Sequence, residues 1–215
     1  MRYYIADLHF YHNNLNKDMD FRGFPTEEEM NSYMIAKWNS RVRTNDEVVI
    51  LGDLSLENGA KTAEVLTRLH GRKYLIVGNH DKYLEDRHFD KSLFGWISPY
   101  MEISDNKRKV VLSHYPQLCY NGQYRIDENA VPKTYMLYGH VHNSYDELMI
   151  NRFIFEMRQE IRDVRGYKTK IPIPCNLINT FAMFSDYVPL TLDEWIVLDE
   201  KRRAELYAND RGDTK

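Results

Sequence analysis

The sequence predicts an α/β protein with a mixed sheet system whose loops gather at one end. Three observations support this: short apolar runs alternate with helical patterns, each such run ends in a polar cluster, and five clusters recur in order along the 215 residues. Five of the eight histidines fall inside the clusters. The clusters are Asp7-Leu8-His9, Gly52-Asp53, Gly78-Asn79-His80-Asp81, Ser113-His114 and Gly139-His140-Val141-His142.

The first three clusters each follow a predicted strand. Residues 3–6 are a short apolar run, and Asp7 and His9 then occupy alternate positions, so both side chains can face one side if the chain stays extended. Residues 47–51 are β-branched and uninterrupted, as is typical of a strand covered on both faces. Residues 73–77 repeat this pattern. We therefore expect successive strands to deliver their polar residues to one region.

Helices are predicted between and after these strands. Apolar residues at helical spacing predict a helix over roughly 26–40 and another over 60–70, with a further helix at the C-terminal end. The first and last begin with a capping-box pattern, in which a threonine is followed three residues later by a glutamate: Thr26 with Glu29, and Thr191 with Glu194. The alternation of strand and helix is that of an α/β protein.

The second half of the chain predicts further strands. Residues 100–103 and 109–112 flank a turn-forming segment, 104–107, and the second arm leads into Ser113-His114. Residues 135–138 lead into Gly139-His140 in the same way, and residues 176–180 form a final strand. These strands complete the mixed sheet system.

One domain over residues 1–215, with an insertion at about 143–175, is expected from the length of the chain. The insertion consists of an amphipathic helix, 146–164, and a basic connector marked by prolines, 166–174. Since the helix follows His142 directly, three alternatives are open: a lid over the site, a dimer surface, or a plain surface helix. The sequence leaves the oligomeric state undecided.

Composition excludes several functional classes. Lys and Arg total 29 against 32 Asp and Glu, for a formal net charge of −3, so no bulk positive field would hold nucleic acid. The two cysteines, Cys119 and Cys175, are too few for a disulfide framework or a thiolate zinc site. We find no signal peptide and no apolar run near the ~20 residues that cross a bilayer. A cytoplasmic protein with no membrane partner is expected.

The residue types in the clusters suit a catalytic metal centre. Carboxylate, amide oxygen and imidazole bind hard or borderline divalent ions such as Mn, Fe, Zn, Ni or Mg, and the absence of thiolate argues against purely structural zinc. Two ions about 3.5–4 Å apart need a bridging anion, and Asp53 is the expected bridge. Gly52, Gly78 and Gly139 would let the backbone turn sharply beside the ligands.

Taken together, the five clusters resemble those of the calcineurin-like metallophosphoesterase superfamily, most strongly its small bacterial and phage phosphoesterases. The resemblance implies a four-layer α-β-β-α sandwich, with two mixed sheets face to face, helices outside, and a dinuclear site at the carboxyl ends of the strands. It implies that Asp7, His9, Asp53 and His142 hold one ion. It implies that Asp53, Asn79, His114 and His140 hold the other, with Mn preferred and Fe, Zn, Ni or Mg as alternatives.

The resemblance also implies catalytic roles. His80 matches a histidine that is not a ligand and that stabilises the phosphoryl oxygens or protonates the leaving group, with Asp81 as its orienting partner. His12 and Arg22 are added candidates for contact with the phosphate. The expected reaction is hydrolysis of a phosphodiester or phosphomonoester by in-line attack of a metal-bridging hydroxide.

Other functions stay open beside this one. The expected partner is a small phosphoester or a nucleotide. A nuclease acting on nucleic-acid ends is the second candidate, although only the 158–170 region offers a modest basic cluster. A non-catalytic binding module on the same fold is a third, which the complete ligand set disfavours.

Overall fold

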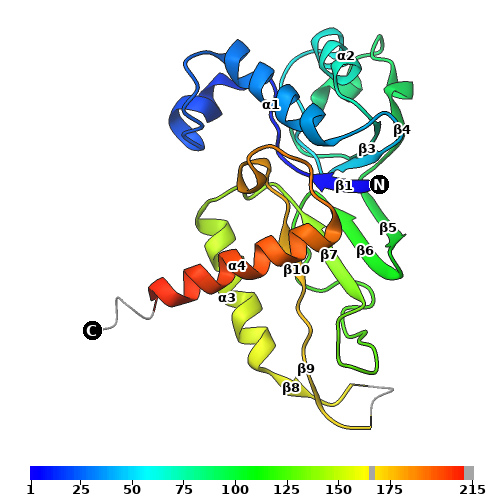
Figure 1. Ribbon diagram of the computed structural model, residues 1–215, viewed down its shortest axis with the longest axis vertical. Helices are drawn as coiled ribbons and strands as arrows, with labels where there is room; N and C mark the ends of the chain where they lie inside the picture. The colour runs from blue at the N-terminus through cyan, green and yellow to red at the C-terminus, as the bar shows by residue number, and fades with distance from the viewer. Residues whose placement is uncertain (165–167, 211–215) are drawn as a thin grey trace.

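Two four-stranded sheets face each other in the computed structural model, which describes residues 1–164 and 168–210 (Figure 1). The first sheet has the order β1-β2-β3-β4, and all of its strands are parallel. The sequence had suggested two mixed sheets, but this sheet is purely parallel. The fourth strand was not predicted, because it is a largely half-buried edge strand with a glycine at its second position. The strands are β1 (Arg2–Ile5), β2 (Glu47–Ile50), β3 (Arg72–Ile76) and β4 (Phe94–Ser98).

The second sheet is mixed, with the order β10-β7-β6-β5. Its first three strands are parallel, and β5 joins β6 in an antiparallel hairpin. The hairpin turn is only Asn106-Lys107, both at positive φ, so the strands extend further into the predicted turn than expected. The strands are β5 (Tyr100–Asp105), β6 (Arg108–Ser113), β7 (Thr134–Tyr138) and β10 (Leu177–Asn179).

Helices cover the outer faces of both sheets. The outer face of the first sheet packs against α1 (Glu27–Arg41) and α2 (Gly59–Arg68), and that of the second sheet against α3 (Tyr145–Gln159). Residues of both sheets, Tyr4 and Leu137 among them, form one buried core between the layers. The expected four-layer architecture is confirmed. Short helical turns complete the list: η1 (Leu15–Met19), η2 (Lys82–Glu85), η3 (Lys91–Leu93) and η4 (Ala182–Ser185).

The C-terminal helix α4 (Leu192–Asp210) closes one edge of this sandwich. Its Trp195 is buried in the core between the sheets, and the indole N–H donates to the carbonyl of Tyr4 at 2.9 Å. The predicted capping box is present, since Thr191 Oγ accepts from the Glu194 amide and the Glu194 carboxylate accepts from the Thr191 amide. The helix is thereby fixed at its start and along its buried face.

The predicted insertion is partly a layer of the fold. Helix α3 is shorter than expected and buries Ile150 and Ile154 against the second sheet, so it is not a plain surface helix. A small hairpin follows, made of β8 (Ile161–Arg162), which replaces the end of the predicted helix, and β9 (Ile171–Pro172), which lies in the predicted connector. Residues 165–167 of that connector lie outside the described residues. No helix in the described part of the chain could span a membrane.

Candidate metal centre

Two groups of side chains that could bind metal lie side by side where the polar clusters meet. Asp7, His9 and His142 form one group, and Asp53, His114 and His140 form the other. Within each group the ligand atoms lie within 4.8 Å of one another. These residues follow strands β1 and β2 of the first sheet and β6 and β7 of the second, and within each sheet the carboxyl ends of the parallel strands lie at one edge. Six of the seven predicted ligands are thus placed in two groups.

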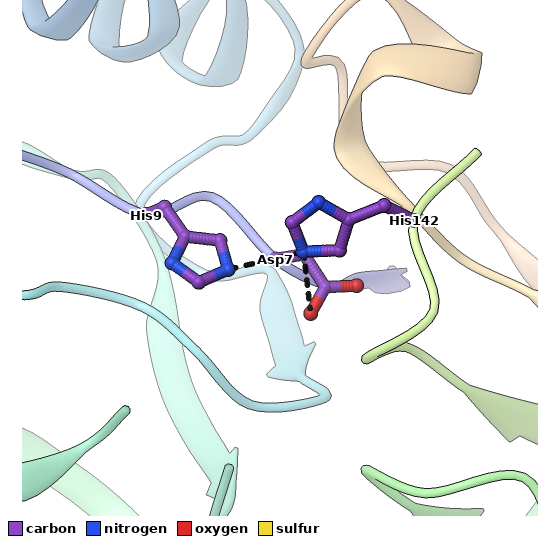
Figure 2. A group of neighbouring side chains, drawn as sticks. All are labelled: Asp7, His9 and His142. Atoms are coloured by element: carbon purple, nitrogen blue, oxygen red, sulfur yellow. Dashed lines mark hydrogen bonds and ion pairs between the residues drawn. The ribbon is translucent and has the colours of Figure 1, made fainter. Parts of the chain in front are cut away.

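Figure 2 shows the first group, in which three ligand atoms point at one another. The Nε2 atoms of His9 and His142 are 3.1 Å apart, and Nε2 of His142 is 3.8 Å from a carboxylate oxygen of Asp7. Asp7 and His9 are buried, with at most 1% of their surface exposed. Buried lone pairs that converge in this way need a proton or a cation between them, so the donor set fits a divalent ion.

Asp53 joins the two groups. Its Oδ2 lies 3.5 Å from Nε2 of His9 in one group and 3.4 Å from Nε2 of His114 in the other. One carboxylate oxygen therefore faces both groups, which is one of the ways in which a carboxylate can bridge two ions. Asn79, the seventh predicted ligand, has its amide oxygen 3.0 Å from Nε2 of His114 and belongs geometrically to the second group.

Three of the histidines are held by a partner on the ring nitrogen that faces away from the centre. Nδ1 of His142 lies 2.8 Å from a carboxylate oxygen of Asp20, and Nδ1 of His114 lies 2.8 Å from the carbonyl of Leu51. Nδ1 of His9 lies 3.3 Å from Nδ1 of His12. An oxygen acceptor at Nδ1 keeps the proton there and leaves Nε2 free as a metal ligand. Asp20, which was not singled out in the sequence, is part of the centre.

The ligands converge through backbone turns, not through an extended chain. Positive φ angles occur at five of the residues that carry ligands, with values from 49° to 71°. Asp and His tolerate this left-handed conformation better than most residues, at a cost of about 1–2 kcal/mol each. The segment after β1 is therefore not extended, which was the stated condition for Asp7 and His9 to face one side, yet both side chains reach the site. The five are Asp7, His9, Asp53, His140 and His142.

Two glycines allow the loops to approach each other. A Cβ atom at Gly78 would lie 2.2 Å from Oδ1 of Asp53, and one at Gly52 would lie 2.3 Å from Nδ1 of His114. Gly52 also has a φ of +91°, which disfavours any other residue. Both positions behave as predicted, because the backbone occupies space that a side chain would need.

Burial and charge set the protonation of the ligands. Burial raises the pKa of Asp7 to about 6 and lowers the pKa of His9 well below its ordinary value, so the imidazole is neutral as a metal ligand requires. For His114, burial acts to lower the pKa, but the carboxylates of Asp53 and Asp7 outweigh it and raise the pKa to about 9. The Nε2 atom of His114 faces Asn79 and Asp53, so a proton on Nε2 would occupy the place where a cation would bind.

A cleft of about 520 Å³ opens over the two groups. His12 and His80 both line it, and their ring centroids are 6.1 Å apart. The His80 amide donates to Oδ1 of Asp53 at 2.8 Å, which ties the position of His80 to the bridging carboxylate. Among the described residues that line the cleft, none is lysine or arginine. Positive charge for a phosphate must therefore come from histidines or bound ions.

Asp81 has a different position from the one expected. Its carboxylate is buried and accepts hydrogen bonds from three backbone amides, those of Asp53 at 3.0 Å, Leu54 at 2.9 Å and Gly78 at 2.8 Å. No bond between the Asp81 carboxylate and the His80 ring occurs among the described contacts. The predicted orienting role is therefore corrected: Asp81 holds together the two loops that carry Asp53 and Asn79.

Arg22 is also placed differently. Its side chain is fully buried, and its guanidinium donates to the carbonyls of Leu8 and Asp7 at 2.7 and 3.1 Å. It also pairs with Asp20 at 3.0 Å. The expected contact with a phosphate is corrected, because the guanidinium lies beneath the ligand loop. The residue positions this loop and, through Asp20, the imidazole of His142.

A four-layer α/β fold with two adjoining ligand groups at its strand ends defines a metal-binding protein of the α-β-β-α class. The chain belongs to the calcineurin-like phosphoesterase superfamily, because the model of that superfamily's domain matches residues 3–154. The protein is accordingly a metal-dependent phosphoesterase in the general sense. The resemblance found in the sequence is confirmed.

Relatives occur in archaea, bacteria and phages. An uncharacterized protein of Methanocaldococcus jannaschii is 33% identical over 211 residues, which cover 97% of this chain and 96% of the relative. The gene 66 protein of Mycobacterium phage D29 is 28% identical over 66% of this chain and 78% of its own length. The crystal structure of a protein of unknown function from Aquifex aeolicus, 25% identical, matches with a TM-score of 0.57 over 92% of this chain and 98% of that chain.

Proposed function

We propose that the protein hydrolyses a phosphodiester or phosphomonoester of a small molecule at two divalent ions. Asp7, His9 and His142 would hold one ion, His114, His140 and Asn79 the other, and Asp53 would bridge them. The observation that carries this proposal is the position of Asp53, whose Oδ2 faces histidine nitrogens of both groups at 3.5 and 3.4 Å. We expect Mn, with Fe, Zn, Ni or Mg as alternatives.

The charge distribution of the cleft supports a metal-dependent reaction. A phosphoester is an anion. The described residues that line the cleft include three carboxylates, Asp20, Asp53 and Asp146, and no lysine or arginine. Without bound cations these carboxylates would repel the substrate. Two divalent ions would offset that charge and lower the pKa of a coordinated water toward neutrality.

His80 is the candidate general acid. Its side chain lines the cleft while half-buried, and its ring centroid is 5.3 Å from that of His9. We propose that its imidazolium donates a proton to the oxygen of the departing alcohol. His12 stands on the same side and is proposed as a second contact for the phosphoryl oxygens.

A small substrate is favoured over a nucleic acid. The basic region expected to serve a nuclease begins at Arg158, near the end of α3, whereas the start of α3 lines the cleft through Ser144 and Asp146. The helix contains 15 residues, so the two ends are roughly 20 Å apart at about 1.5 Å per residue. Figure 1 shows β8 and β9 at the far end of this helix. A nuclease therefore remains the second candidate without an observation in its favour.

The test compares substrates that differ in their leaving group. With the Mn-loaded protein, His80→Ala should reduce hydrolysis of a phenyl phosphodiester by about 100-fold or more, and that of a p-nitrophenyl phosphodiester by less, because p-nitrophenolate leaves without a proton. His88→Ala, a change at an exposed histidine outside the cleft, is the control. Equal losses for both substrates would remove the general-acid role.

A second variant addresses the bridge. Asp53→Asn should lower both the number of bound ions and the rate, which metal analysis and the same assays would show. Full activity in Asp53→Asn, or no hydrolysis by the wild type on a panel of phosphoesters with Mn, Ni, Mg, Zn and Fe, would overturn the proposed function. The panel also determines the preferred bond and metal.

A further inference from the structure

An apolar recess opens beside the metal centre on the side of His140. It has a volume of about 320 Å³, and its apolar lining is Tyr115, Pro116, Val141, Met149 and Ile150. His140, Val141 and Asp146 line both this recess and the cleft over the metal groups, so the two spaces share a wall. A molecule bound at the metal centre can therefore extend into the recess.

Tyr115 connects the recess to the metal ligands. Its ring centroid is 4.3 Å from that of His140, and its hydroxyl lies 3.3 Å from the amide oxygen of Asn79. Half of the Tyr115 surface is exposed, at 50%. Its backbone follows His114 directly, so the ring is held at the border of the second ligand group.

The walls of the recess differ in their exposure. Val141 and Ile150 are buried, with 7% and 8% of their surface exposed, and they belong to the packed core under α3. Met149, in contrast, is 53% exposed although it is a large apolar residue. The recess thus has a rigid apolar floor, with an aromatic side chain and a flexible thioether at its opening. Both are groups that pack well against aromatic rings.

We propose that this recess binds an aromatic ring carried by the phosphoester whose phosphoryl group lies at the metal centre. This inference rests on the proposed function and specifies its substrate class. The recess is open to solvent, and its volume of about 320 Å³ leaves room for a six-membered ring laid against its floor. The ring would lie between Tyr115 and Met149 and displace water from Ile150.

Asp146 narrows the class of ring. Its position at the shared wall places a carboxylate near both the ring and the phosphoryl group. A carboxylate accepts hydrogen bonds and repels a second anion. A heteroaromatic ring with N–H donors on its edge, such as a nucleobase, fits this wall better than a ring that carries a further phosphate.

The experiment keeps the leaving group constant and changes the other substituent. The wild type, loaded with Mn, is assayed on the 2,2,2-trifluoroethyl esters of phenylphosphonate and of methylphosphonate, whose shared leaving group is not aromatic, and the ratio of their kcat/KM values is divided by the ratio of the uncatalysed rates. We expect a corrected preference for phenyl of about 10- to 50-fold. A cyclohexyl analogue separates aromatic from merely apolar recognition. Equal or better hydrolysis of the cyclohexyl ester would overturn the aromatic assignment.

Two variants locate the preference. Met149→Gln should reduce the phenyl-to-methyl ratio about 3- to 5-fold, and Tyr115→Ala should bring it close to 1. Met19→Gln is the matched control, because Met19 is also an exposed methionine, at 66%, but it lines the cleft without lining the recess. It should retain the wild-type ratio. If Met19→Gln lowers the ratio as much as Met149→Gln does, the ring binds elsewhere.

Binding without turnover separates this inference from the proposed function. Titration calorimetry of the Mn-loaded protein should show phenylphosphonate binding at least 10-fold more tightly than methylphosphonate, and Met149→Gln should reduce that difference. Such binding with no hydrolysis would keep the recess and reject the function. Hydrolysis of the methyl ester with equal affinities for both phosphonates would reject the recess and keep the function.

Discussion

Replacing Asp20 by asparagine tests whether this carboxylate holds His142 in its metal-binding orientation. One oxygen of Asp20 lies 2.8 Å from Nδ1 of His142, and the other accepts two hydrogen bonds from Arg22 at 3.0 and 3.1 Å. An asparagine of the same size has one acceptor and one donor group at its end. It can therefore keep only one of the two partners in their present form.

The two possible orientations of the asparagine amide at position 20 differ in their energetic cost. With its NH₂ toward Arg22, the amide would place a donor against a guanidinium whose side chain is 0% exposed and leave these N–H groups without any acceptor on residue 20, at a cost of about 3–5 kcal/mol. With its NH₂ toward His142, it would force the histidine proton onto Nε2, the atom that faces Asp7 and His9. Losing such an outer partner costs about 10- to 100-fold in metal affinity, or about 1.4–2.7 kcal/mol. The second arrangement is cheaper, so we expect it.

Calorimetric titration of Mn into metal-free protein measures the effect. We expect Asp20→Asn to bind Mn about 10- to 100-fold more weakly and to lose about 1–3 kcal/mol of unfolding free energy, because Arg22 keeps only a neutral acceptor. Asp18→Asn, an exposed carboxylate in the same segment, should change neither quantity. Wild-type metal affinity in Asp20→Asn with a lower Tm would refute the reasoning, since Asp20 would then stabilise the loop alone.

Three further predictions concern stability and pH. Asp81→Asn should lower the free energy of unfolding in urea by about 1–3 kcal/mol, because an amide cannot accept from all three backbone N–H groups; wild-type stability with slower hydrolysis would return Asp81 to a catalytic role. A chelator should lower Tm, since ions at 100 times their Kd stabilise the folded protein by about 2.7 kcal/mol; an unchanged Tm would contradict the metal centre. Lys109 and Tyr100 lower the pKa of Glu102 from 4.5 to about 2, so its stabilising contribution is present above about pH 4.5 and is lost as the pH falls toward 2. An NMR titration should find this low pKa and its return toward 4.5 in Lys109→Ala; an ordinary pKa in the wild type would refute the pairing.

The fold could be predicted from the sequence where local patterns are strong. Capping boxes marked the starts of α1 and α4, and apolar runs marked the strands that precede the clusters. The edge strand β4 lacked that signal, because it is mostly half-buried and contains Gly95. The hairpin of β8 and β9 was missed because each strand has only two residues. Short or weakly buried strands form because they pair with neighbouring strands, and these neighbours cannot be identified from the residues of the strand itself.

The sequence by itself determined the chemistry of the ligands and their meeting place. Each cluster follows its own strand, and the carboxyl ends of parallel strands lie at one edge of a sheet, so the clusters of each sheet could be placed together. The packing of the two sheets against each other then joins the clusters after β1, β2 and β3 to those after β6 and β7. Only the tertiary structure decided which groups hold these ligands in place. Asp20 contacts His142 across 122 positions of sequence, and Asp81 reaches the Asp53 amide across 28. Such contacts depend on how loops pack against each other, and neither spacing nor residue type records the direction in which a buried carboxylate points.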